Sequence, residues 1–377
     1  MNNIFEKALE NIKKAKSIRE AGGVNNIPFG LTNLDRIVPG VMKGLQYIVC
    51  ANSSVGKTQL TKFLFVNQVY KFIKENPNLG IKLKILYFAL EESKEEFMKS
   101  LISNRLKEKY DITVDSRMLS GINHTLSNQI LEKIESCREY FSELERCVEV
   151  IDSVSNPFGI YKYIRGYATD NGTHHYKSHV FRHTLENGQI EERTEQIYDR
   201  YEPNDPNEIV IDIVDHISLL AEENGGTLHE AMGKMSSTYG RKMITKHFNH
   251  CLVLVQQLAA ATEKLQFTNS GQSIEAKLEP SLESLGDNKL TARDALIVLG
   301  LFAPERYQIE KHLGYDIRIL KDNYRCISVL KNRFGLSNYK FPVLFNGATN
   351  LFSELPKLDD PELRRIYEEV RNNRNNV

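Results

Sequence analysis

The sequence predicts an α/β fold in which a mainly parallel central sheet is flanked by helices, with an N-terminal helix and an inserted β-hairpin added to it. Seven short runs rich in Val, Ile and Leu follow one another from about residue 45 onward, separated by helical stretches. Near-continuous apolar strands are what a parallel sheet covered on both faces requires. The runs are 46–51, 84–90, 148–151, 209–214, 251–256, 295–301 and 326–330.

Length and composition set the frame for these elements. The 377 residues can bury the core of one large α/β domain with appendages. Lys and Arg number 49, as do Asp and Glu, so no global field marks a nucleic-acid coat or a membrane-surface protein. The five cysteines are widely spaced with no C-x-x-C pair, which argues against a disulfide framework or a zinc site and favours a reducing compartment. They are Cys50, Cys137, Cys147, Cys251 and Cys326.

No apolar run reaches the ~18–20 residues that span a bilayer, and alternating charges stand where a signal peptide would be apolar. We therefore expect a cytoplasmic protein with no membrane partner. Its expected division is an N-terminal linker helix at 1–24, a main domain at 25–360 with an insertion at 168–206, and a C-terminal helix with a polar tail at 361–377. The final residues, RNNRNNV, are expected to be disordered.

The first predicted helix covers residues 2–20 and is amphipathic, with Glu and Lys opposite its apolar face. Gly22 and Gly23 end it. It either folds back on its own domain or acts as a linker helix that docks on a neighbouring subunit. The apolar face consists of Ile4, Phe5, Ala8, Leu9, Ile12 and Ala15.

Two polar segments interrupt the alternation of strands and helices. Residues 168–206 hold an Asn187-Gly188 pair between two alternating stretches, which predicts a β-hairpin inserted before the next core strand. Its histidines match no metal-ligand spacing and are expected to be solvated. Residues 261–291 form the second gap, and loops of that length are often functional. The histidines are His174, His175, His179 and His183.

Residues 51–58 read ANSSVGKT and lie between an apolar run and a helical stretch, the context of a phosphate-binding loop. We expect backbone N–H groups from Ser54 to Lys57 to bind the β-phosphate of ATP, with Gly56 permitting close approach and Lys57 bridging the β- and γ-phosphates. Thr58 would hold Mg²⁺. The predicted nucleotide contacts are Ser53, Ser54, Val55, Gly56, Lys57, Thr58 and Gln59.

Hydrolysis also needs a carboxylate that orients water and a second one in the Mg²⁺ shell, both at strand ends beside the loop. KILYFALEES offers Glu91 and Glu92 for the first role, although adjacent glutamates at a helix start can serve only its dipole. EIVIDIVDHISLL offers Asp212 and Asp215 for the second. The apolar run alone favours Asp212, because three aliphatic residues precede it.

The stretch 25–58, NNIPFGLTNLDRIVPGVMKGLQYIVCANSSVGKT, resembles the start of the ATPase domain of DnaB-type replicative helicases, a family that includes the phage ring helicases. The family text reads IPTGFxxLDxxxGGxxxGxLxxxAxRPSxGKT. Ala51 is therefore expected, whereas Asn52 and Ser53 replace its Arg-Pro pair. The resemblance covers about residues 1–356 without the hairpin. It implies a RecA-like P-loop NTPase fold and the cofactors ATP and Mg²⁺.

Further motifs follow in the family's order, and the resemblance gives them roles. The SLEM segment aligns with ALEE, which implies that Glu91 is the catalytic base. The DHIS text favours Asp215 over Asp212 for the metal. The SQLxR segment aligns with QQLAA, which implies that Gln257 senses the γ-phosphate and signals its loss to DNA-contacting loops. Ala260 stands where the family has a polar or basic residue.

The resemblance also implies that the site is shared between subunits. KNRFG resembles the family's KxRxG, so Lys331 and Arg333 would reach the γ-phosphate bound by an adjacent subunit, as an arginine finger does. SLGDNKLTARDA occupies the place of the family's DNA-gripping loop, although Gly286 stands where the family has Arg. Residues 221–232 are a second candidate loop. The DNA contacts so implied are Gly286, Asp287, Asn288 and Lys289.

The function implied by the resemblance is that of an ATP-dependent replicative DNA helicase. It would form a homo-hexameric ring in the family's manner, translocate on single-stranded DNA and unwind duplex 5′ to 3′. A primase or helicase loader would be a further partner, and a phage-encoded chain would work in the host cytoplasm. Two alternatives are a RecA-, RadA- or KaiC-like ATPase with a recombination or regulatory role, and a nucleotide-dependent assembly module without motor activity.

Overall fold

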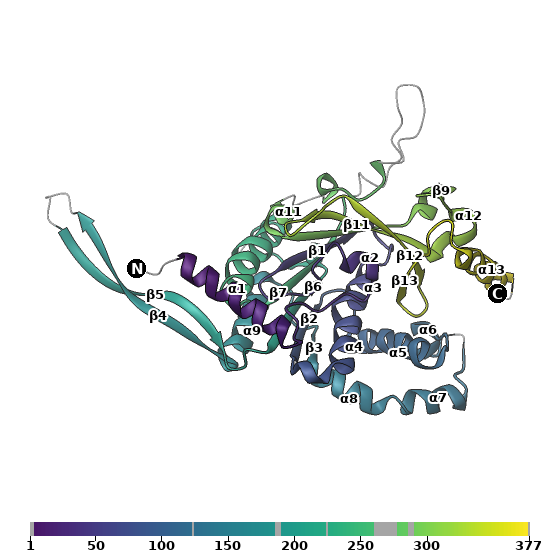
Figure 1. Cartoon of the computed structure of the whole chain (residues 1–377), viewed down its shortest axis with the longest axis horizontal. Helices are drawn as coiled ribbons and strands as arrows, with labels where there is room; N and C mark the ends of the chain where they lie inside the picture. Colours follow the sequence, from purple (N-terminus) through teal and green to yellow (C-terminus); the bar gives the residue numbers. More distant parts are fainter. Residues whose placement is uncertain are drawn as a thin grey trace, which may run out of the picture.

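Aliphatic runs build a nine-stranded sheet through the centre of the protein (Figure 1). The computed structural model describes residues 4–122, 124–184, 190–223, 225–259, 277–285 and 290–375. The strand order is β13-β12-β11-β8-β1-β7-β6-β2-β3. The six parallel strands are β1 (Gln46–Ala51), β2 (Lys82–Ala89), β3 (Val148–Ile151), β6 (Glu208–Asp215), β7 (Cys251–Gln257) and β8 (Ile297–Phe302).

Three further strands extend one side of the sheet in antiparallel pairing. They are β11 (Tyr324–Asn332), β12 (Tyr339–Asn346) and β13 (Leu351–Glu354). All seven predicted runs are strands, and the mainly parallel α/β prediction is confirmed. The run at 326–330 belongs to the antiparallel part. After β8 ends, the chain does not cross back to the edge where β8 began, so β11 starts beside the end of β8 and runs in the opposite direction. The first residues of β11 therefore lie at the edge where the parallel strands end.

Helices cover both faces of the sheet, as the buried strands require. Alternate side chains of a strand point to opposite faces, so Tyr47 and Val49 pack in one core cluster and Ile48 and Cys50 in the other. On the first face lie α2 (Thr32–Asp35), α3 (Lys57–Lys62), α4 (Gln68–Glu75), α5 (Lys94–Tyr110) and α8 (Arg138–Cys147). On the second lie α9 (Pro157–Asp170), α10 (Leu228–Gly233), the π-helix η4 (Lys234–Thr245) and α11 (Leu290–Asp294).

The remaining helices are α1 (Ile4–Glu20), α6 (Ser116–Leu119), α7 (Asn128–Glu135), α12 (Ile317–Leu320) and α13 (Pro361–Asn375). Leu363 and Val370 of α13 pack with α12 in a third core cluster. The expectation of disorder from residue 371 onward is wrong as far as Asn375, because the helix continues to that residue. Residues 376–377 lie outside the described part.

The predicted N-terminal helix is present as α1, and its apolar face is partly exposed. Ile4 and Ile12 are 84% and 64% exposed, whereas Leu9 and Ala15 are half-buried. Within the described chain, the domain therefore covers only part of this face.

The predicted insertion is a long two-stranded hairpin that projects from the body (Figure 1). It consists of β4 (Gly172–Thr184) and β5 (Ile190–Pro203), and the Asn187-Gly188 turn lies outside the described residues. His174 packs against Phe248 at its base, and His179 and His183 are exposed farther out. In the described parts of the chain, no three His, Cys, Asp or Glu side chains come together as a metal site.

The five cysteines are free thiols. Among the helices that the structure describes, none combines the length and the apolar character that a bilayer crossing needs.

Candidate nucleotide-binding site

The loop between β1 and α3 opens into a cavity of about 650 Å³ at the carboxyl edge of the sheet. Six of the seven predicted nucleotide contacts line this cavity, namely Ser53, Ser54, Gly56, Lys57, Thr58 and Gln59. Val55 is instead buried beneath the loop. Gly56 has a φ of 108°, a backbone conformation that residues with a Cβ rarely adopt, so glycine suits the loop at this position.

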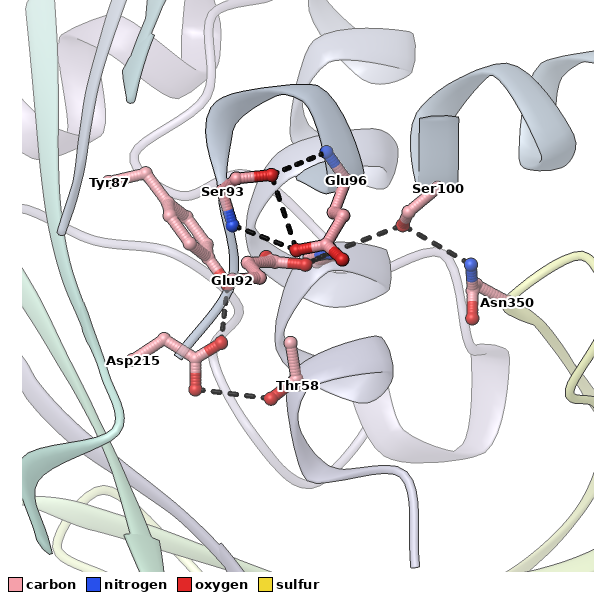
Figure 2. A network of polar contacts seen from close by, with 9 residues as sticks. Thr58, Tyr87, Glu92, Ser93, Glu96, Ser100, Asp215 and Asn350 are labelled. Carbon is pink, nitrogen blue, oxygen red and sulfur yellow. Dashed lines mark hydrogen bonds and ion pairs between the residues drawn. The ribbon is translucent and has the colours of Figure 1, made fainter. Parts of the chain in front are cut away.

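Asp215 is the carboxylate that the fold brings to Thr58. It ends β6 beside Ala89 of β2, and its Oδ1 accepts a hydrogen bond from the Thr58 hydroxyl at 3.2 Å. The Tyr87 hydroxyl donates to Oδ2 at 2.6 Å (Figure 2). Burial raises the pKa of Asp215, while the bond from Tyr87 and the charge of Lys62 oppose that rise.

Asp212 lies on the same strand but does not line the cavity. It is fully buried, and its Oδ2 lies 2.9 Å from Nδ1 of His250. Burial raises the pKa of Asp212, and the charge of His250 opposes the rise. Residues three apart on a strand face opposite sides, so only one of the two carboxylates can meet Thr58. A hydroxyl and a carboxylate side by side are hard oxygen ligands of the kind that Mg²⁺ takes together with phosphate oxygens.

The two adjacent glutamates after β2 have different environments. Glu91 is exposed and lines the cavity. Glu92 lies against the α3 helix, where Lys62 Nζ contacts its Oε2 at 2.7 Å and also donates to Ser100. Burial raises the pKa of Glu92, and Lys62 acts against that rise. Both glutamates line the cavity, but Glu92 is paired with Lys62, whereas Glu91 is exposed.

A helix cap fixes the turn that carries these glutamates. The Ser93 hydroxyl accepts from the Glu96 backbone N–H, and the Glu96 carboxylate accepts from the Ser93 N–H at 3.0 Å (Figure 2). This reciprocal capping box begins α5 immediately after Glu92. The start of the helix, and hence the direction of the preceding turn, is thus encoded in four consecutive residues.

The two glutamines at the end of β7, Gln256 and Gln257, have different surroundings. Gln257 pairs with Ala51 in the ladder, outside the cavity lining, and its side chain lies near enough to the ring of His216 to act against the lowering of that ring's pKa. Burial, then the charge of Lys57, lower the pKa of His216. His216 directly follows Asp215, so the Gln257 side chain lies near the end of β6.

Gln256 is a buried residue that sequence reasoning did not single out. Its Nε2 donates to the Leu285 carbonyl at 2.5 Å, and its Oε1 accepts from the Thr291 hydroxyl at 2.6 Å. These partners flank the predicted DNA contacts Gly286, Asp287, Asn288 and Lys289, which lie outside the described residues, as does Ala260. One amide side chain at the strand end thereby ties together the two sides of that loop.

Lys331 and Arg333 lie far from the cavity of their own chain. The β11 ladder places Cys326 opposite Phe302, where β8 ends, and Asn332 opposite Ile297, where it begins. Six residues of strand span about 20 Å. Lys331 donates to the Ala292 carbonyl at 2.6 Å, and Arg333 is exposed. The structure therefore does not bring this pair to the Lys57 end of the sheet.

Two arginines that the sequence did not reveal contact the loop directly. Arg325, at the start of β11, donates from Nε to the Val55 carbonyl at 2.7 Å, and Arg306 donates to the Ser53 carbonyl. Both lie more than 250 residues along the chain from their acceptors. No local pattern marks them, because an arginine that begins an apolar strand is unremarkable by itself.

No protein-family model matches the sequence, and no curated protein matches it either. Solved structures do match its fold. A DnaB-like replicative helicase, studied with its interactions with primase, has a TM-score of 0.65 at 16% identity over 94% of this chain and 68% of its own. The ATPase domain of G40P has a TM-score of 0.67 at 16% identity over 94% of this chain and all of its own. The chain therefore has the RecA-like fold of these ATPase domains.

Proposed function

We propose that this chain is the ATPase motor of a ring-forming DNA helicase of the DnaB type. It would hydrolyse ATP with Mg²⁺ at subunit interfaces, translocate on single-stranded DNA and unwind duplex 5′ to 3′. The observation that carries the proposal is the split between the two halves of the site. The phosphate loop, Glu91 and Asp215 meet in one cavity, whereas Lys331 and Arg333 lie at the opposite edge of the sheet.

This split has a direct consequence for assembly. Lys331 and Arg333 lie away from the phosphate loop of their own chain, so as fingers they would reach phosphate only across a subunit interface. A head-to-tail interface, repeated around a ring, would bring each finger to the loop of the next subunit. The exposed Ile4 and Ile12 of α1 fit the same assembly as the docking face of a linker helix.

The chemistry assigned to each residue follows from its place. Lys57 would neutralise the β- and γ-phosphates, and Glu91 would orient the attacking water. Thr58 and Asp215 would hold Mg²⁺, which would offset the charge on the phosphates. Gln257, which lies near the end of β6, would respond to the γ-phosphate.

DNA contact is assigned to the side of the sheet where the described residues that flank the two candidate loops share a cavity. This second cavity, of about 660 Å³, is lined by Gly225, Gly226 and Lys234 on one side and by Leu290 and Arg293 on the other. Basic side chains at this place could bind the phosphate backbone without reading bases. Neutral net charge is no obstacle, because each subunit of a ring contributes only a few contacts. A primase or a loader is the further partner that the fold relationship suggests.

ATPase measurements with and without single-stranded DNA test the proposal, alongside strand separation on a forked duplex. We expect DNA-stimulated turnover that Lys57→Ala and Glu91→Gln abolish. Turnover without unwinding, together with filaments instead of rings in electron micrographs, would favour a RecA-, RadA- or KaiC-like role. Equal backgrounds for the wild type and both variants would indicate an assembly module without motor activity.

A further inference from the structure

We infer that Arg306 and Arg325 are positioning residues that aim the backbone N–H groups of the phosphate loop at the bound nucleotide. The inference rests on the proposed ATP-binding function and adds to it two residues outside the loop. Arg306 comes from the segment between β8 and β11, and Arg325 from the start of β11. That segment lies at the carboxyl edge of the sheet because β11 starts where β8 ends.

Arg325 is a buried guanidinium with almost all of its donors committed inside the chain. Its side chain is 2% exposed. Nε donates to the Val55 carbonyl, Nη1 to the carbonyls of Asp322 and Tyr324, and Nη2 to the Asp322 carboxylate at 2.9 Å. Four of the five N–H donors of a guanidinium are thus used. The cation also lies 4.9 Å from the centre of the Phe345 ring.

Arg306 holds the loop two residues earlier. It lies in the short 3₁₀-helix η8 (Pro304–Tyr307), and its Nη1 donates to the Ser53 carbonyl. The next residue, Tyr307, accepts a hydrogen bond on its hydroxyl from the Asn52 side chain at 2.6 Å. The loop is therefore fixed at three successive places by residues of one short segment and by the start of β11.

Peptide geometry turns these carbonyl contacts into a direction for the N–H groups. A trans peptide is planar, so its C=O and the N–H of the following residue point to opposite sides. Holding the Ser53 carbonyl outward directs the Ser54 N–H inward, and holding the Val55 carbonyl directs the Gly56 N–H inward. These two belong to the backbone stretch that would bind phosphate, so the arginines set two of its donors.

The loop conformation itself explains why such support is needed. Ser54 has a φ of 55°, in the left-handed region that a residue with a Cβ seldom adopts. Gly56 has a φ of 108°. A strained loop conformation persists only when the surrounding structure holds it in place. The contacts of Arg306 with Ser53 and of Arg325 with Val55 hold the backbone on either side of Ser54.

Nucleotide binding by charge-conserving variants tests the inference. Arg325→Lys and Arg306→Lys keep the positive charge but lose the planar fork that reaches a carbonyl at a fixed angle. Arg318→Lys is the matched control, because Arg318 is an exposed arginine paired with Asp316 on the same segment. The measurements are MgATP affinity by calorimetry, KM and kcat of the ATPase, and the melting temperature of the nucleotide-free protein.

We expect each of the two variants to bind MgATP about tenfold more weakly, the loss of about one charge-assisted hydrogen bond. KM should rise by more than kcat falls, and the nucleotide-free melting temperature of Arg306→Lys should match that of Arg318→Lys. Arg306 is exposed, so its variant decides the case if Arg325→Lys does not fold. MgATP affinity within twofold of wild type in Arg306→Lys overturns the inference. A wild-type protein that binds no MgATP would instead refute the proposed function.

Discussion

Replacing Lys62 by Met should destabilise the protein by about 3 kcal/mol at neutral pH. Lys62 and Glu92 form an ion pair at 2.7 Å whose side chains are 3% and 19% exposed. Removing one partner of a buried pair costs about 3–5 kcal/mol because the other charge stays uncompensated, and the partial exposure of Glu92 places this pair at the lower end. The hydrogen bond to Ser100 is lost in the same variant.

The cost should depend on pH, and the sign follows from Glu92. Burial already raises its pKa above the ordinary value, and losing Lys62 removes the main influence that lowers it. A raised folded-state pKa contributes stability that is fully present below the unfolded-state pKa of about 4.5 and is lost as pH rises through the folded-state value. The loss of unfolding free energy caused by Lys62→Met should therefore become smaller as the pH is lowered from about 7.5 to about 5.

Urea unfolding followed by circular dichroism, at fixed protein concentration and without nucleotide, measures these differences. The double variant Lys62→Met/Glu92→Met should return to within about 1 kcal/mol of wild type, since an apolar pair can replace a buried ion pair. Lys71→Met is the matched control: it breaks a more exposed pair with Glu108 at 3.5 Å and should cost less than about 1 kcal/mol. A Lys62→Met cost as small as the control, or one unchanged between the two pH values, would refute the reasoning.

Three further predictions concern the site shared between subunits, the hydrogen bond between Gln256 and Thr291, and the buried Asp212. Mixing inactive Lys57→Ala and Arg333→Ala subunits should restore ATP turnover at about a quarter of the interfaces of randomly mixed rings, and no recovery would place the complete site within one chain. Thr291→Val should lower the unfolding free energy by about 1–3 kcal/mol, because the Gln256 oxygen loses its buried donor, whereas Thr291→Ser should cost less than half as much in the same urea titration. Asp212→Asn should gain stability relative to wild type as pH rises from about 4 to about 7, because burial raises the pKa of Asp212 and its stabilising contribution is lost on ionisation; a difference that does not change with pH in urea titrations would contradict this.

Much of the site follows from local sequence because its parts sit at the ends of strands. Apolar runs locate the strands, and the polar residues that follow them must meet at one edge of a parallel sheet. ANSSVGKT, the LEES turn and the DHIS segment are each readable in this way. The capping box from Ser93 to Glu96 likewise fixes the start of α5 from four residues.

Tertiary structure decided what depends on direction and distance. That Asp215 contacts Thr58 while Asp212 contacts His250 depends on which side of β6 each carboxylate faces and on where the strand ends. Glu91 and Glu92 are adjacent in sequence, yet only the position of Lys62 on α3 separates the exposed carboxylate from the paired one.

By itself, then, the sequence determined an α/β fold with a phosphate loop and neighbouring strand-end carboxylates, because strand periodicity and loop chemistry are local properties. Only the folded chain showed that Arg325 supports a loop 270 residues away and that Lys331 and Arg333 lie at the opposite edge. The physical reason is the antiparallel return of β11. It carries one end of a single strand to the phosphate loop and the other end away from it, and no periodicity within that strand records which neighbour it will pair with.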